Sequence, residues 1–251
     1  MQSRPANREP FFHSVHIVWD EVGDPDTFPY SIPAIKKMGR MNLHPAVTFI
    51  IGENGSGKST LLEAMAVRLN FDESGGDANA NFEVRPLDGG LHDAIRIQSS
   101  LYRRPGDRFF LRAETVFNYA SHIDREAIED RKFIQRYGYK SLHARSHGEM
   151  FLAIVQNRMK AESFFIMDEP EAALSPTRQI ATLKEIDWLV RTGCQFVIAT
   201  HSPILMAYPD SIIYELSGDG IRQVEYEETE HYTLTRSFLE HPKAFLKRLL
   251  E

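Results

Sequence analysis

The chain has 251 residues, of which 42% are hydrophobic and 25% are charged. This composition excludes a disordered or membrane-embedded chain and supplies enough apolar side chains for a sizeable core. The formal net charge is −6, which argues against a protein that coats nucleic acid electrostatically. Cys194 is the only cysteine, so an intrachain disulfide is impossible and a reducing compartment is expected.

Neither a targeting segment nor a membrane segment is expected. The first ten residues contain two arginines with no apolar segment behind them, which does not fit a cleaved signal peptide. No apolar run approaches the ~20 residues that a membrane helix needs. We therefore expect a soluble, cytoplasmic protein.

The predicted elements alternate along the chain. Apolar or β-branched runs predict strands over residues 11–19, 46–51, 95–99, 108–112, 164–167, 195–200 and 211–216. Helical patterns cover residues 61–69, 121–137, 147–160, 176–192 and the tail from 232 onward, which is interrupted at Pro242. A loop is expected over 72–90, and a turn over 104–107 joins the strands on either side. The alternation favours one α/β domain over 1–251, with a mostly parallel sheet flanked by helices and an inserted helical subdomain at about 115–160.

The strand at 46–51 leads into a glycine-rich loop. The loop fits the pattern G-x-x-x-x-G-K-[ST] at every position, through Gly52, Glu53, Asn54, Gly55, Ser56, Gly57, Lys58 and Ser59. Its backbone N–H groups and the following helix N-terminus suit a phosphate chain. Lys58 is expected to reach the β- and γ-phosphates, and the Ser59 hydroxyl is expected to bind Mg²⁺. The alternative, a chance glycine-rich turn, does not explain the strand before the loop and the helix after it.

Two carboxylates follow the apolar run at 164–167. Asp168, at the end of a buried strand, is placed to bind Mg²⁺. Glu169 can orient or deprotonate an attacking water, which points to hydrolysis rather than simple phosphate binding. The alternative is an ordinary acidic strand end before a turn at Pro170.

Two further motifs are weak when taken alone. Ser146-His147-Gly148-Glu149 opens a helix and suits an anion, although a capping box with Ser146 as N-cap and Glu149 at N3 has the same sequence. His201 follows the strand at 195–200 and can hydrogen-bond a γ-phosphate, although many such residues are only polar strand ends.

In combination, the order of these motifs resembles the ABC-type ATPases. The likeness is strongest to the soluble heads of SMC, RecF and related repair proteins, and to small stand-alone ATPases that carry SHGE, DEPEAALSP and ATHSPIL. The resemblance implies an ABC-type P-loop NTPase fold in which ATP and Mg²⁺ bind and ATP is hydrolysed. It also implies an ATP-dependent homodimer coupled to an unidentified protein partner.

The resemblance assigns roles to residues of this chain. It implies that the Walker A loop runs from Gly52 to Thr60, that Asp168 is the Walker B carboxylate, and that Glu169 is the hydrolytic base. It also implies that Ser146 and Gly148 contact the γ-phosphate bound by the other subunit. The remaining assignments are a D-loop at residues 173–175 and a switch histidine at His201.

The chain departs from the family pattern at several positions. His147 stands at a signature position where glycine is usual, and Glu149 ends the signature as in SMC-like heads. Glu114 is favoured over Gln98 as the Q-loop equivalent and as a third Mg²⁺ ligand, with ordinary strand-end polar residues as the alternative for both. Phe28 and Tyr30 are candidates for stacking on adenine, although an exposed-loop or core position is the plainer interpretation of each.

The remaining features favour simple structural roles. Arginines and lysines gather around 103–112 and 131–140, where a solvated face is favoured over a nucleic-acid surface. The histidines show no spacing that suggests zinc. Phe238, Leu239, Phe245, Leu246 and Leu249 are expected to pack in the core rather than to form a docking helix. Two alternative functions remain open: the nucleotide-binding subunit of a membrane transporter, and a nucleotide-gated scaffold with negligible turnover.

Overall fold

The computed structural model describes residues 8–71, 89–113, 116–129, 135 and 140–250. Its strands are β1 (Phe12–Ile17), β2 (Met41–Asn42), β3 (Val47–Gly52), β4 (Ile95–Ser99), β5 (Asp107–Arg112), β6 (Ser163–Asp168), β7 (Gln195–Ala199), β8 (Ser211–Ser217) and β9 (Gly220–Val224). The α-helices are α1 (Pro33–Lys36), α2 (Lys58–Arg68), α3 (Leu91–Ala94), α4 (Val116–Glu129), α6 (His147–Arg158), α7 (Pro176–Arg191), α8 (Pro203–Met206), α9 (Glu230–Glu240) and α10 (Pro242–Leu250). Short 3₁₀ turns lie at Trp19–Glu21, Leu142–Ala144, Pro170–Ala173 and Tyr226–Glu228.

The larger sheet has six strands in the order β5-β6-β7-β3-β8-β9. All neighbouring pairs are parallel except β8 and β9. Every residue of β3, β6 and β7 is buried, as expected for apolar strands covered on both faces of a parallel sheet. The predicted mostly parallel sheet is therefore confirmed. Since parallel strands run in one direction, the residues that follow β3, β6 and β7 meet at one edge of this sheet.

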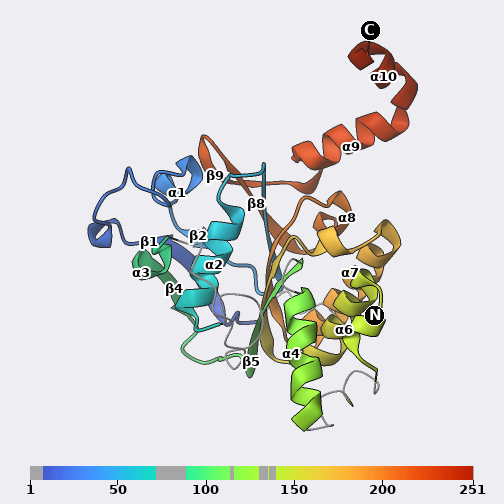
Figure 1. Cartoon of the computed structure of the whole chain (residues 1–251). Coiled ribbons are helices and arrows are strands. Elements are labelled where there is room, and N and C mark those ends of the chain that lie inside the picture. The colour runs from blue at the N-terminus through green and yellow to red at the C-terminus, as the bar shows by residue number, and fades with distance from the viewer. Residues whose placement is uncertain (1–7, 72–88, 114–115, 130–134, 136–139, 251) are drawn as a thin grey trace.

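Helices and a second sheet divide the two faces of the larger sheet (Figure 1). One face packs against α1, α2 and a three-stranded antiparallel sheet in the order β2-β1-β4. The other face packs against α4, α6 and α7. Helices therefore flank both faces, as predicted, and the antiparallel sheet beside α1 and α2 is an addition that the sequence did not indicate. The expected turn at 104–107 does connect β4 to β5, but these strands belong to different sheets.

Most of the predicted elements are found within a few residues of their expected bounds. The loop predicted over 72–90 lies outside the described residues apart from its last two glycines, which precede α3. The helix predicted to start at residue 121 begins at Val116 as α4, and much of its expected C-terminal end is not described. The strand β9 was not predicted. In chain order α4 and α6 lie between β5 and β6, which are neighbours in the sheet.

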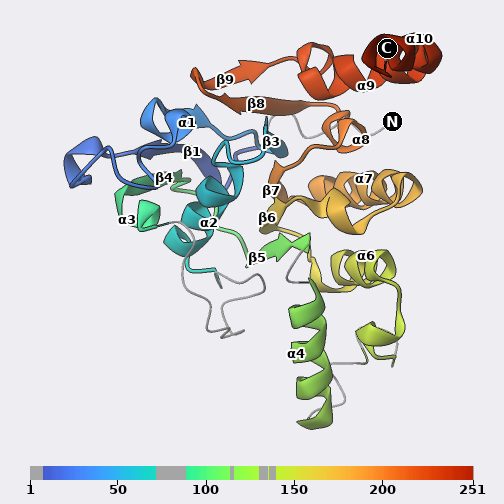
Figure 2. The same cartoon turned by 45° about the horizontal axis from the view of Figure 1, so that its top comes forward.

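The helices α9 and α10 form a C-terminal arm over residues 230–250 that extends away from the sheets (Figure 2). Its large apolar side chains are exposed at Leu234, Phe238, Leu239, Leu246, Leu249 and Leu250. The expectation that this segment packs in the core is therefore wrong. The ring of Phe238 instead contacts Phe245 within the arm, with 5.6 Å between their centroids. Among the described helices, none combines the length and the apolar character required to cross a bilayer.

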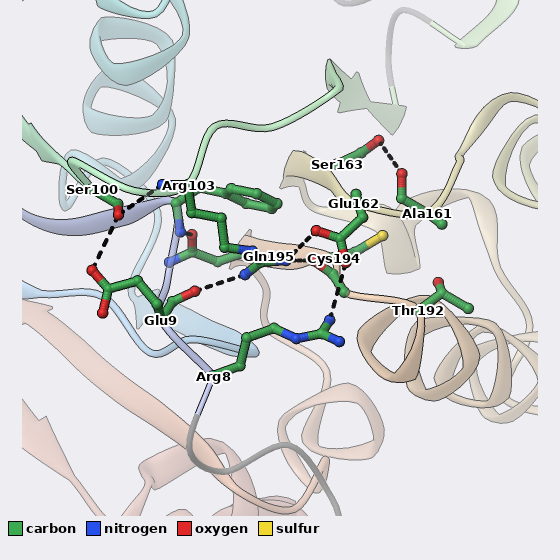
Figure 3. Close-up of polar contacts among 12 residues, drawn as sticks. Arg8, Glu9, Ser100, Arg103, Ala161, Glu162, Ser163, Thr192, Cys194 and Gln195 are labelled. Carbon is green, nitrogen blue, oxygen red and sulfur yellow. Dashed lines mark hydrogen bonds and ion pairs between the residues drawn. The ribbon is translucent and has the colours of Figure 1, made fainter.

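Several of the basic side chains around 103–112 bind other parts of the chain. Arg103 donates to the backbone oxygens of Glu9 and Gly193 and to the Glu162 carboxylate, each at 2.7 Å, beneath the amino ends of β6 and β7 (Figure 3). Arg108 donates to the carbonyl of Leu69. These contacts give both arginines a structural role. Arg131, Lys132 and Arg136 lie outside the described residues.

The amino end of β7 is fixed to β1 through Gln195, which is labelled in Figure 3. The side chain of Gln195, at the start of β7, accepts from the N–H groups of Phe11 and Phe12 and donates to the carbonyl of Phe12. The neighbouring Cys194 is buried, its thiol donates to the carbonyl of Lys160, and burial raises its pKa. The thiol therefore stays protonated at neutral pH and serves as a packing residue.

Candidate functional site

The glycine-rich loop connects β3, in the middle of the sheet, to α2. Gly52 has a φ of 143°, and a Cβ there would lie 2.3 Å from the carbonyl oxygen of Leu216. Gly57, with a φ of 100°, adopts the left-handed conformation immediately before α2. The buried hydroxyl of Ser56 has no hydrogen-bond partner among the described residues. A tight loop with an unsatisfied hydroxyl beside a helix N-terminus fits a phosphate group.

Lys58, the first residue of α2, is 4% exposed and folds back over the loop. Its ammonium donates to the carbonyls of Gly52 at 2.9 Å and Glu53 at 3.0 Å. Burial lowers the pKa of Lys58, whereas the charges of Glu169, Asp168 and Glu171 act in the opposite direction. The ammonium therefore lies between the loop and the carboxylates that follow β6.

The hydroxyl of Ser59 and the carboxylate of Asp168 meet at the end of β6. Ser59 Oγ donates to Asp168 Oδ1 at 3.2 Å, and Arg112 Nε donates to Asp168 Oδ2 at 3.2 Å. Arg112 also pairs with the buried carboxylate of Glu63 on α2. Burial raises the pKa of Asp168, while the Arg112 guanidinium and the Ser59 hydroxyl lower it. Arg112 thus fixes one oxygen of Asp168 so that the other faces Ser59.

A hydroxyl and a carboxylate oxygen are the hard ligands that Mg²⁺ prefers. The pairing of Ser59 with Asp168 therefore fits a magnesium ion, with phosphate oxygens of a bound nucleotide completing its shell. Glu114, expected as a third ligand, lies outside the described residues. Gln98, the alternative, lies on β4 in the three-stranded sheet, where its side-chain oxygen accepts from Ser14.

Glu169 and His201 face one another beside the Asp168 carboxylate. Glu169 has a φ of 48°, a left-handed conformation uncommon for a residue with a side chain, and its N–H donates to the carbonyl of Ala199. His201 Nε2 lies 3.4 Å from Glu169 Oε1. Burial and the charge of Lys58 lower the pKa of His201, against the opposing effect of Glu169. A strained backbone that is held by the neighbouring strand is typical of functional positions.

Several side chains that organise this site were not predicted from the sequence. Glu171 is half-buried, and its carboxylate accepts from the His201 N–H at 2.5 Å and the Thr200 hydroxyl at 2.7 Å. Burial raises the pKa of Glu171. His231, on α9, lies with Nε2 3.0 Å from His201 Nδ1. Arg112 was counted only as a member of a basic cluster. The acidic DEPE run offered a clue to Glu171, whereas nothing local in the sequence connects Arg112 or His231 with the loop.

The serine motif lies at the start of α6, beside α7. Ser146 and Glu149 form a capping box, and Arg178 on α7 donates to the Ser146 hydroxyl at 3.0 Å and pairs with Glu149 at 3.2 Å. Gly148 is buried there. The site has no room for a side chain, since a Cβ would lie 2.8 Å from the carbonyl oxygen of Ala173 and 2.6 Å from Arg178 Nη1. The capping-box interpretation is therefore confirmed. Ser146 and His147 are exposed, so this end of α6 is open to a second molecule.

The other predicted residues lie around the loop or apart from it. Glu53, Asn54 and Gly55 are exposed at the loop tip, and Thr60 is half-buried in α2. Asn54 and Glu53 line a hollow together with Glu169, His201 and His231. Ser146 and Gly148 are not among the residues lining this hollow or its neighbours at the loop.

The two candidate adenine-stacking residues have local contacts of their own. Phe28 is 59% exposed and its ring lies against Gly89. The Tyr30 hydroxyl donates to the carbonyl of Gly90 at 3.1 Å, and its ring contacts Trp19 edge-on. Neither aromatic residue lines the hollows at the glycine-rich loop.

The class of protein that this fold and loop define is the ABC-type P-loop ATPases. The family described as the AAA domain matches residues 37–199, and the chain belongs to it. The family resemblance and the fold class predicted from the motifs are thereby confirmed.

Individual relatives are distant. The chain is 24% identical over 196 residues to a ribose import ATP-binding protein of Clostridium perfringens, covering 72% of this chain and 38% of that protein. It is 26% identical over 216 residues to a galactose/methyl galactoside import ATP-binding protein of Haemophilus influenzae, covering 79% and 42%. The chain thus spans about two fifths of the length of these relatives.

One solved structure supports the fold. An SMC head bound to the C-winged helix domain of ScpA aligns with a TM-score of 0.51 and 14% identity, covering 86% of this chain and 98% of that one. At this identity the likeness is one of fold.

Proposed function

We propose that this protein binds Mg-ATP at the Gly52–Thr60 loop and hydrolyses it, with Lys58 holding the phosphates and Glu169 and His201 acting on the attacking water and the γ-phosphate. The observation that carries the proposal is the convergence of the Ser59–Asp168 pair and the Glu169–His201 pair at one edge of the sheet. Bound Mg²⁺ would neutralise phosphate charge beside Ser59 and Asp168. In this scheme His201 holds an N–H toward the site, and Glu169 accepts a proton from water.

We further propose that residues 1–251 form one cytoplasmic ATPase domain, with the helical subdomain at about 115–160, and that it works as an ATP-dependent dimer. Exposure of Ser146 at the start of α6 supports a contact with nucleotide on another subunit. Opening and closing of such a dimer would drive a protein partner.

The testing experiment measures the dimer and the chemistry in parallel. Glu169→Gln should retain ATP, accumulate a dimer by light scattering with Mg-ATP, and lose phosphate release by roughly a hundredfold or more. Lys58→Ala should lose ATP binding and therefore both effects, whereas Glu185→Gln on the outer helix α7 should behave as wild type. Full turnover in Glu169→Gln would remove this residue from the role of base.

A second candidate is the nucleotide-binding subunit of a membrane transporter, which the two sugar-import relatives favour. The serine motif SHGE argues for an SMC-like head instead. Copurification of the full-length chain from detergent-solubilised membranes separates the two, because a transporter subunit would elute with a membrane protein, whereas the SMC-like candidate predicts that it elutes alone or with soluble partners. The third candidate, a nucleotide-gated scaffold, predicts ATP binding and dimerisation with negligible wild-type phosphate release.

A further inference from the structure

Three side chains from separate elements form a continuous row at the edge of the sheet. His201 Nε2 lies 3.4 Å from Glu169 Oε1, and His201 Nδ1 lies 3.0 Å from His231 Nε2. The two imidazole rings are tilted by 49°, with 5.2 Å between their centroids. His231 is the second residue of α9, the helix that begins the C-terminal arm.

The chemistry of the three groups fixes where the protons lie. His201 Nε2 is buried without a hydrogen-bond partner among the described residues, and it lies 3.4 Å from Glu169 Oε1. A carboxylate oxygen can only accept from this nitrogen, so the position of Glu169 favours a proton on His201 Nε2. A neutral imidazole protonated at Nε2 accepts at Nδ1, so His231 must donate from its own Nε2. His231 Nδ1 is then the unprotonated nitrogen. This atom is buried without a hydrogen-bond partner among the described residues, and an N–H there would be left unsatisfied.

Two contacts hold His231 in register with His201. The Thr229 hydroxyl caps α9 by accepting from the Tyr232 N–H. Tyr226, just before the helix, donates its hydroxyl to the carbonyl of Pro203 at 2.9 Å, and Pro203 lies two residues after His201. The start of α9 is therefore anchored to the same segment that carries His201.

The charged groups nearby are compatible with a neutral pair. Burial, followed by the charge of Lys58, lowers the pKa of His201. Burial, followed by His201 and Lys58, lowers the pKa of His231, against opposing effects of Glu230 and Glu215. With both rings neutral, the tautomer of His201 depends on its two neighbours, Glu169 at Nε2 and His231 at Nδ1.

We propose that His231 is a positioning residue for the site: it donates to His201 Nδ1 and so holds His201 in the tautomer whose Nε2–H faces Glu169 and the hollow beside the glycine-rich loop. The inference rests on the proposed hydrolysis only for its effect on rate. Because His231 belongs to α9, the same bond joins the C-terminal arm to the nucleotide edge of the sheet.

A pair of substitutions separates hydrogen bonding from packing. In His231→Gln the side-chain amide can donate from about the position of Nε2, whereas His231→Phe keeps a ring but removes the donor. We expect His231→Gln to hydrolyse ATP close to the wild-type rate and His231→Phe to lose kcat by roughly tenfold to a hundredfold, as for other partners that orient a functional imidazole. The Kd of a fluorescent ATP analogue should be the same for both variants. Equal rates for wild type and His231→Phe, or equal losses in the two variants, would overturn the proposal.

Nitrogen-15 NMR of the imidazoles provides a readout that does not depend on turnover. His201, assigned by its loss in His201→Asn, should be the Nε2–H tautomer in the full-length wild-type protein and in His231→Gln, and a mixture of tautomers in His231→Phe. An Nδ1–H tautomer or an imidazolium at neutral pH in the wild type would refute the role of His231. If the wild type fails to hydrolyse ATP but shows the expected tautomer, the proposed function fails and the positioning role stands.

Discussion

At the scale of single residues, His44 shows how a side chain outside the nucleotide site can make folding depend on pH. It lies just before β3, and its Nδ1 accepts from the N–H groups of Ala46 at 3.1 Å and Val47 at 3.4 Å. An accepting nitrogen cannot carry a proton. Burial lowers the pKa of His44 from its usual 6.5, with Asp210 acting in the opposite direction.

The lowered pKa has a definite sign for stability. Below about pH 7 the unfolded chain binds a proton at His44 more readily than the folded chain, so the contribution of His44 is present above pH 6.5 and is lost as the pH falls. His44→Asn keeps an acceptor oxygen but does not titrate. We expect urea unfolding between about pH 7 and about pH 5.5 to give a shallower loss of unfolding free energy for His44→Asn than for wild type. His241→Asn, exposed on the arm, controls for the loss of an imidazole, and a slope unchanged by His44→Asn would contradict the argument.

Some residues of the site could be predicted from the sequence and others could not. Ser59 and Asp168 belong to motifs that are each recognisable, and their 3.2 Å contact follows from the common direction of β3 and β6. The partner of Asp168, Arg112, comes from the end of β5, and His231 comes from an arm after the last strand. A single side chain at a strand end or in a helix carries no periodicity that indicates which distant group it will meet.

At the scale of elements, the contact between α6 and α7 depends on Gly148. A Cβ at this position would come within 2.8 Å of a backbone oxygen, that of Ala173, which cannot move without shifting the turn before α7. Arg178 lies on the other side of the same glycine and also holds Ser146. The glycine therefore sets how closely the serine motif and the turn that follows Glu169 approach each other.

Gly148→Ala should destabilise the fold by about 1–3 kcal/mol, the usual cost of overpacking, although the better helix propensity of alanine offsets part of it. Thermal unfolding should show a fall in Tm of several degrees, at roughly 2–4 °C per kcal/mol for a chain of this size. Gly39→Ala is the matched control, because a Cβ there meets no atom within 4 Å. A Tm equal to that of the control would mean that α6 and α7 can move apart to accommodate the Cβ with no loss of unfolding free energy.

Predicted and observed elements agree best where burial is complete. The strands β3, β6 and β7 are short apolar runs between turn residues, and all were predicted. The helix α7 was predicted from its helical pattern, but of its isoleucines Ile180 is 60% exposed while Ile186 is fully buried. Periodicity identifies an apolar face but not how much of it the neighbouring elements cover, and β9, with three exposed or half-buried residues in the middle, had no such pattern.

At the scale of the whole molecule, the C-terminal arm also shows that periodicity identifies an apolar face but not whether other elements cover it. The apolar residues of α9 and α10 have the spacing of a packed helix face, which led to the expectation of core packing. In the structure the two helices instead extend away from the body (Figures 1 and 2). Most of their large apolar side chains are exposed. Sequence pattern alone therefore cannot distinguish a buried face from an exposed one of the same composition.

Exposure predicts how the arm responds to substitution. Leu239→Ala and Leu249→Ala, at positions 69% and 71% exposed, should change the free energy of unfolding by no more than about 0.5 kcal/mol. Leu205→Ala on α8, where the side chain is fully buried, should cost about 2–5 kcal/mol. Chemical unfolding of the three variants provides the comparison. Losses in the arm variants as large as that of Leu205→Ala would mean that the arm is packed against the body.

The place of β3 in the larger sheet has a consequence for biosynthesis. Val47 pairs with Phe196 on one side and with Ser211 on the other, so both neighbours of the strand that leads into the glycine-rich loop are synthesised about 150 residues or more after it. At about 5–20 residues per second, the ribosome takes on the order of ten seconds or more to supply them. During that interval β3 lacks both of its neighbouring strands, and the nascent chain must keep this apolar strand from pairing elsewhere. The site around the glycine-rich loop can therefore assemble only after β7 and β8 have been synthesised.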